Sequence, residues 1–364
     1  MRLLKDKILG KHVALIFFLI FFAGTVSAGG SSKAGEGGGL DVQEFVFGHI
    51  NDSYSWHIVT VFGVHVSIPL PVIVKSNDRG WFLFSSSRFH HGETPYEGFE
   101  ISQSDDYNGK IVEVINGEEV RPWDISITKN VLALFVGCAL LLIIFLGIAR
   151  KYKRAPLQKP TGLQAIMEPL ILMMEEDVIK PCIGKNYRKF SAYILTVFFF
   201  ILLNNILGII PIFPGGANLT GNIAITLILA LLTFIIVNVF GTREYWKEVF
   251  WPDVPAWLKV PIPLMPLIEI IGVITKPVAL MIRLFANILA GHIMILMLIG
   301  LIFIFSVVSP YIGAGISVLS VLLVVFMSFL EVLVCFIQAY VFATLSALFI
   351  GLSQVEPHHS HSKN

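Results

Sequence analysis

Two long apolar segments near the carboxyl end constrain the fold of this 364-residue chain more than any other feature. They cover residues 263–305 and 311–352, and each is about twice as long as the roughly 20 residues that one perpendicular membrane crossing requires. Within a bilayer, each segment must be strongly tilted, bent or subdivided. Hydrophobic residues make up 55% of the chain and charged residues only 14%, which is typical of a protein that lies largely in lipid.

Three shorter apolar segments precede these two, at residues 130–149, 191–212 and 222–240. The first is followed by a basic cluster, which the positive-inside rule places in the cytoplasm; it consists of Arg150, Lys151, Lys153 and Arg154. Residues 163–179 mix apolar and acidic residues, which favours a helix lying at the membrane interface. The sequence therefore predicts an all-α integral membrane protein with about five membrane helices, of which the two long, tilted ones form an antiparallel hairpin.

The amino-terminal part has a different composition. Residues 1–28 have a basic start, a short apolar run and a small-residue exit, which predicts a signal peptide; an uncleaved first helix is the alternative. Residues 29–128 begin with a Gly/Ser-rich linker and continue with short alternating runs between turns, which predicts a small, mostly β periplasmic domain. Residues 129–354 form the predicted membrane domain, and residues 355–364 a disordered cytoplasmic tail.

Charge and cysteine content argue against several functions. A net charge of +1 provides no electrostatic basis for binding nucleic acid. Cys138, Cys182 and Cys335 lie in or beside apolar stretches, without the spacing of a zinc site or of a disulfide framework. We therefore expect no metal site and no cofactor.

The charged residues inside the two long apolar segments are the strongest functional signal. A charge at the bilayer centre costs about 2.5–3.5 kcal/mol on insertion scales, so each one needs a partner or a function. The charged residues are Glu269, Lys276, Arg283 and Glu331, and their polar companions are Asn287, His292 and Gln338.

Glu269, Lys276 and Arg283 follow one another at intervals of seven, which keeps them near one helix face. Lys276 and Glu269 either belong to a polar path or form a structural pair near a membrane surface. Arg283 differs because no acidic residue lies within eleven positions on either side. Its guanidinium stays protonated, so it can hold a fixed positive potential but cannot pass a proton onward.

The other polar residues suggest a proton path. Asn287 shares the helix face of Arg283, whereas His292 lies about 13 Å further along the helix and on its opposite side. Glu331 and Gln338 share a face of the last helix. His292 and Glu331, together with water, can pass protons one at a time. The alternative is a buried His–Glu hydrogen bond that only fixes helix register.

The run from Arg283 through Leu284-Phe285-Ala286-Asn287-Ile288-Leu289-Ala290-Gly291 to His292 resembles the signature helix of subunit a of rotary F-type ATP synthases. Lys276-Pro277-Val278, the segment Asn204-Asn205-Ile206-Leu207-Gly208-Ile209-Ile210-Pro211, and Glu331 with Gln338-Ala339-Tyr340 support the resemblance, which covers roughly residues 130–353.

The resemblance implies that Arg283 separates two aqueous half-channels and faces the carboxylates of a rotating c-ring. It also implies that His292 and Glu331 line the periplasmic half-channel, that Gln338 lies across from Arg283, and that Asn204 and Asn222 are either channel or packing residues. The implied protein is a non-catalytic, proton-translocating subunit of the bacterial inner membrane, surrounded by lipid. Its implied partners are the c-ring, the subunit b peripheral stalk and the other synthase subunits.

Two rival functions remain open from the sequence. A self-contained secondary ion transporter would bind its solute between repeated halves, but no internal repeat is visible. A non-conducting membrane scaffold would use the charged residues only to hold helices together.

Overall fold

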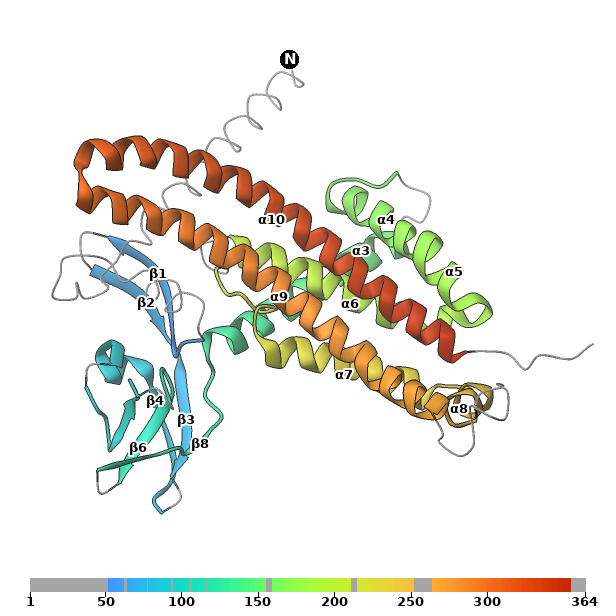
Figure 1. Cartoon of the computed structure of the whole chain (residues 1–364), viewed down its shortest axis with the longest axis horizontal. Coiled ribbons are helices and arrows are strands. Elements are labelled where there is room, and N and C mark those ends of the chain that lie inside the picture. Colours follow the sequence, from blue (N-terminus) through green and yellow to red (C-terminus); the bar gives the residue numbers. More distant parts are fainter. Residues whose placement is uncertain are drawn as a thin grey trace, which may run out of the picture. The chain divides into compact units, whose positions relative to one another are not determined.

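The computed structural model describes residues 52–61, 64–76, 78–92, 94–104, 107–115, 117–154, 159–210, 215–251 and 264–354 (Figure 1). The predicted signal peptide and carboxyl-terminal tail lie outside these residues. The described part is mostly helical and has a small strand-containing region at its amino-terminal end, as expected.

The strand-containing region comprises three small antiparallel sheets. Their strands are β1 (Ser55–Val61), β2 (Val64–Pro69), β3 (Pro71–Ser76), β4 (Gly80–Ser85), β5 (Phe99–Ile101), β6 (Ile111–Ile115), β7 (Glu118–Val120) and β8 (Trp123–Asp124). β1 pairs with β2, β3 lies between β4 and β8, and β6 lies between β5 and β7. A 3-10 helix, η1 (Ser86–Gly92), follows β4.

Side chains of β3 alternate between a buried and an exposed face, as a half-buried strand requires. The buried core of this region consists of Tyr54, Val72, Val74, Phe89, Phe99 and Ile111. Gly80 and Gly117 have φ angles of 88° and 86°, which L-residues with a side chain rarely adopt. These glycines sit at the turns that lead into β4 and β7.

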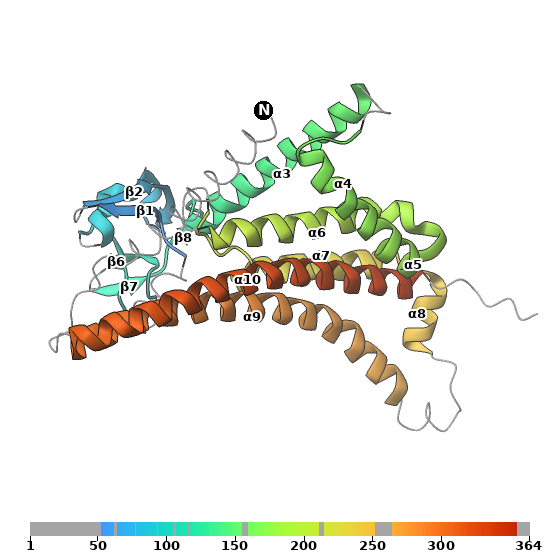
Figure 2. The ribbon, with the colours of Figure 1, turned by 90° about the horizontal axis from the view of Figure 1, so that it is seen from above.

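The helices, in chain order, are α3 (Lys129–Arg154), α4 (Leu163–Met173), the π-helix η2 (Met174–Ile179), α5 (Lys180–Ile183), the 3-10 helix η3 (Gly184–Asn186), α6 (Tyr187–Ile209), α7 (Ile223–Val239), α8 (Arg243–Phe250), α9 (Leu264–Val308) and α10 (Pro310–Ser353). Figure 2 shows them from a second direction. The two long apolar segments are thus single helices, not subdivided ones, although Pro277 lies inside α9.

Among the described residues, four helical stretches are long and apolar enough to cross a membrane. They are Lys129–Arg154, Leu163–Ile209, Met265–Ile302 and Gly315–Ser353. A fifth arises if α7 and α8, which meet at a bend of 102°, count as one broken span. The chain is therefore a multi-pass membrane protein with four to five membrane-capable helices.

The chain divides into two compact units. The first comprises Met1–Gly137, Ile206–Leu219 and His292–Phe329, and the second comprises Cys138–Asn205, Thr220–Gly291 and Leu330–Asn364. Arg283 and most of the other predicted site residues belong to the second unit, whereas His292 belongs to the first.

Candidate functional site

Within the second unit, a hydrogen bond joins α9 to α10 beside Arg283. Asn287 Nδ2 donates to Gln338 Oε1 at 2.9 Å. Gln338 is buried, so its amide oxygen would lose contact with water without gaining a partner if this bond were absent. The pair fixes the polar face of α9, one turn beyond Arg283, against the last helix.

Glu331 is buried against α9 because the facing residue, Gly291, has no side chain. A Cβ placed at Gly291 would lie 3.2 Å from Glu331 Oε1, closer than the 3.4 Å at which ordinary Cβ contacts begin. A buried carboxylic acid held between two membrane-capable helices can bind and release a proton.

His292 lies in the first unit and is half-buried. A Cβ built on Gly208, near the end of α6, would lie 3.9 Å from His292 Nε2 and 3.3 Å from the carbonyl oxygen of Ala217. The imidazole therefore sits beside a glycine of α6. Sequence reasoning did not single out Gly208 or Gly291 individually; their signal was their place inside the two quoted motifs.

The side chain of Arg283, on α9, is exposed. Among the described residues it makes no hydrogen bond and no ion pair with an acid. The exposed residues before and beside it are mostly apolar, as at Ile271, Ile274, Val278 and Ile282. A permanent cation thus stands in an apolar stripe that nothing in the described chain covers.

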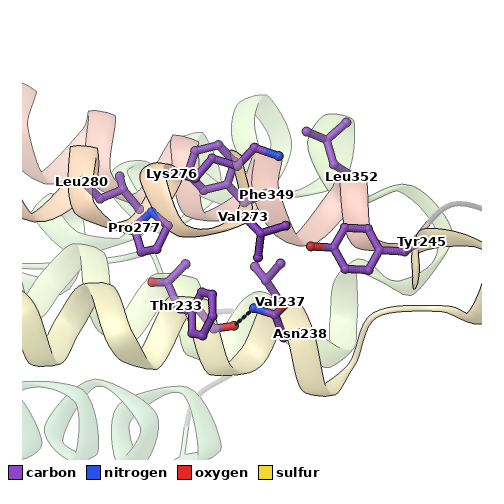
Figure 3. A pocket seen from close by; sticks show the side chains of 11 residues that line it. Thr233, Val237, Asn238, Tyr245, Val273, Lys276, Pro277, Leu280, Phe349 and Leu352 are labelled. Atoms are coloured by element: carbon purple, nitrogen blue, oxygen red, sulfur yellow. Dashed lines mark hydrogen bonds between the residues drawn. The ribbon is translucent and has the colours of Figure 1, made fainter. Parts of the chain in front are cut away.

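Lys276 lies two turns before Arg283, at the edge of a small cavity with a mostly apolar lining (Figure 3). Its Nζ is 5.8 Å from the ring centre of Phe349, and in the described chain no ion pair joins it to Glu269. The cavity holds about 20 Å³, which is room for about one water molecule. Asn238 lines it, and the Oδ1 atom of Asn238 is buried without a hydrogen-bond partner in the described residues.

Asn204 and Asn222 use their side chains within their own helices. Asn204 Nδ2 donates to the carbonyl of Phe200 at 2.7 Å, and Asn222 Oδ1 accepts from the amide of Ala224 at 2.9 Å as the N-cap of α7.

A buried bond that sequence reasoning missed lies next to Asn204. The Thr220 hydroxyl donates to Asn205 Oδ1 at 2.5 Å, and both residues are buried. The doubled asparagine in the second apolar segment was the signal that could have revealed it, because a buried amide in a membrane helix needs a partner.

Both parts of the chain match known protein families. Residues 131–351 match the family described as ATP synthase A chain, and residues 45–127 match a domain of unknown function, DUF8433. The first match agrees closely with the range that the sequence motifs indicated.

Curated relatives agree with the family match. The chain is 47% identical over 245 residues to ATP synthase subunit a of Pelodictyon phaeoclathratiforme, covering 65% of this chain and 68% of the relative. It is 45% identical over 256 residues to the protein of that name from Chlorobium phaeobacteroides strain DSM 266, covering 67% and 71%. For Chloroherpeton thalassium the identity is 40% over 248 residues, covering 66% and 70%. On these grounds, the chain belongs to the ATP synthase A chain family.

Proposed function

We propose that this chain is the stator subunit a of a rotary F-type ATP synthase, in which it conducts protons to and from a c-ring and so couples proton motive force to ATP synthesis. One observation carries the proposal. Arg283 is an exposed cation in an apolar stripe of α9, and no acid of the described chain pairs with it. A charged guanidinium in contact with lipid is energetically costly, so the negative charge that compensates Arg283 comes from another polypeptide.

α9 and α10 form an antiparallel hairpin in this proposal. Lys276 lies over Phe349, Asn287 bonds to Gln338, and Gly291 abuts Glu331. Across these three contacts the residue numbers increase along α9 while they decrease along α10, which supports the antiparallel order. Asn287 and Gln338 then hold the polar face beside Arg283 in a fixed position.

The proton enters from the periplasm past His292 and Glu331. It neutralises a c-ring carboxylate, which then travels through lipid for almost a full turn of the ring before it releases the proton on the other side of Arg283. Arg283 cannot take up or release a proton, so its fixed charge blocks direct leakage between the two half-channels.

The proton leaves towards the cytoplasm through a second half-channel near Lys276 and Glu269. The cavity beside Lys276, with room for water and an unpaired Asn238 oxygen, supports this assignment. The internal bonds of Asn204 and Asn222 favour structural roles for these two residues.

The topology of the proposed subunit follows from the basic end of α3. Residues 1–28 are a signal peptide, residues 29–128 a periplasmic domain, residues 129–354 the membrane channel domain, and residues 355–364 a cytoplasmic tail in the bacterial inner membrane. The c-ring faces Arg283, and the subunit b peripheral stalk and the other synthase subunits are further partners.

Replacement of Arg283 tests this function. Membrane vesicles carrying Arg283→Ala are expected to assemble the synthase but to lose proton-driven ATP synthesis. Thr275→Ala is the matched control, because Thr275 is also exposed on α9 and bonds only within its own helix. Normal synthesis in the assembled Arg283→Ala enzyme would refute the proposal.

A second experiment tests the entry path. The combination of His292→Ala with Glu331→Gln removes the imidazole and the carboxylate of the proposed path, so proton delivery to the ring is expected to fall. Proton flux equal to that of the unaltered enzyme would exclude these two residues from the path.

A further inference from the structure

An exposed apolar patch covers the outer face of the β4–β3–β8 sheet. Trp81 and Leu83 of β4 are 59% and 73% exposed, and Trp123 and Ile125, in and just after β8, are 70% and 59% exposed. Two tryptophans and two large aliphatic side chains therefore stand in water on one sheet of the isolated chain. Exposed clusters of this kind mark an interaction surface.

The strand register brings these side chains together. Lys75 of β3 is the cross-strand partner of Trp81 on one side and of Trp123 on the other. Leu83 is the partner of Ile73, whose carbonyl accepts a hydrogen bond from the amide of Ile125. The opposite face of β3 supplies Val72 and Val74 to the core, so the patch lies on the face that the described domain leaves open.

The patch is attached directly to the start of α3. The amide of Ile125 donates to Ile73, that of Ile127 to Pro71, and that of Lys129 to Ser53, while the amide of Asn130 donates to the Asp52 carboxylate at 3.1 Å. The segment between β8 and α3 is thus hydrogen-bonded to the domain along its length.

We infer that this face, formed by Trp81, Leu83, Trp123 and Ile125 around Lys75, rests on the lipid surface beside the amino end of α3. Only four residues separate β8 from α3, so the sheet lies within roughly 15 Å of the point where the helix begins. Tryptophan is enriched at the level of lipid headgroups, where its ring is partly apolar and its N–H remains hydrogen-bonded.

The charge of the patch fits lipid headgroups. Its central charged residue is Lys75, whose Nζ lies 5.8 Å from the ring centre of Trp81. A long cationic side chain among tryptophans can extend to headgroup phosphates while its methylene stem stays on the apolar surface. The inference rests on the proposed membrane crossing of α3, but not on the proposed proton path.

Fluorescent labels placed one at a time test the inference in the full chain reconstituted in lipid nanodiscs. Leu83→Cys places a label on the patch, and Glu118→Cys places one on the exposed edge strand β7. Both variants need the native cysteines replaced. A third protein keeps only Cys138, which is exposed on α3 and reports whether that helix is in the bilayer.

Lipids with a quencher near the headgroup are expected to quench the label at position 83 severalfold more than the label at 118. Adding Trp81→Ser and Trp123→Ser is expected to reduce the quenching at 83 to the level at 118. Equal quenching at 83 and 118 would overturn the inference. The inference would also be overturned if the label at position 83 were shielded from a water-soluble quencher only in the complete synthase, because that result indicates a protein partner.

The label at Cys138 separates this inference from the proposed function. Quenching of that label by lipids with a deep acyl-chain quencher shows that α3 crosses the bilayer, so a negative result at position 83 then refutes the lipid contact alone. Absence of deep quenching at Cys138 would refute the membrane crossing and with it the inference.

Discussion

Gly291 gives the sharpest structural prediction, because one added methyl group would press on the buried Glu331 carboxylate. The Cβ of Gly291→Ala would lie 3.2 Å from Glu331 Oε1, where ordinary contacts begin at 3.4 Å. Either the carboxylate or α10 must therefore shift by a few tenths of an ångström. The change displaces a group of the proposed proton path without altering its chemistry.

The energy of this contact can be isolated with a second glycine of the same helix. Alanine is favoured over glycine in a helix by roughly 1 kcal/mol, and overpacking a filled site costs about 1–3 kcal/mol. Gly272→Ala makes the same chemical change where nothing lies within 4 Å of the new Cβ. Gly291→Ala should therefore be less stable than Gly272→Ala by about 1–3 kcal/mol.

The assay compares proton-driven ATP synthesis in vesicles that contain equal amounts of assembled enzyme. Gly272→Ala is expected to match the unaltered enzyme, and Gly291→Ala to synthesise ATP more slowly. Adding Glu331→Asp to Gly291→Ala shortens the acid and is expected to restore part of the loss. Equal synthesis by the two alanine variants would show that the packing of Gly291 against Glu331 does not matter for conduction.

Three further predictions concern single contacts. A double-mutant cycle with Asn287→Ala and Gln338→Ala should give a coupling free energy of about 0.6–1.7 kcal/mol in thermal unfolding in nanodiscs. Zero coupling would show that the hydrogen bond at 2.9 Å does not stabilise the protein. Thr220→Val should cost about 1–3 kcal/mol in the same measurement, because buried Asn205 loses its donor; an unchanged unfolding temperature would contradict this. Burial, together with the hydrogen bond to Asp124, raises the pKa of Tyr54, so its contribution to folding is complete below the ordinary pKa of about 10 and is lost as pH rises through the folded pKa. Amide hydrogen exchange should show this alkaline loss, and Tyr54→Phe should lack it.

The sequence predicted the helical plan because apolar segments of membrane length leave little choice of structure. The spans around α3, α6, α7, α9 and α10 match the apolar segments to within a few residues at most ends. Residues 163–179 are helical as expected, and the interfacial position of that stretch stays a prediction. The long segments were predicted only as tilted, bent or subdivided, and the structure shows each as one helix.

The positions of the candidate residues along the helices were predictable from the sequence, but their contacts were not. Seven-residue spacing placed Arg283 on a helix face, yet the partner of Asn287 depends on how α10 packs, which local spacing does not encode. The hydrogen bond from Thr220 to Asn205 and the close approach of Glu331 to Gly291 likewise depend on neighbours distant in sequence. The patch around Lys75 escaped notice because its residues come from three strands whose register is set by pairing.

The central claim is that the open face beside Arg283 contacts a moving ring subunit, and a reversible crosslink tests it most directly. Ala286 is exposed, three residues after Arg283, so Ala286→Cys in a chain lacking native cysteines offers a thiol on that face. The matching cysteine is placed beside the proton-carrying carboxylate of the ring subunit. Oxidation is expected to join the two chains and stop ATP-driven proton pumping, and reduction to restore it. Failure to form the crosslink in the assembled enzyme, or pumping that continues while the crosslink is intact, would contradict the account.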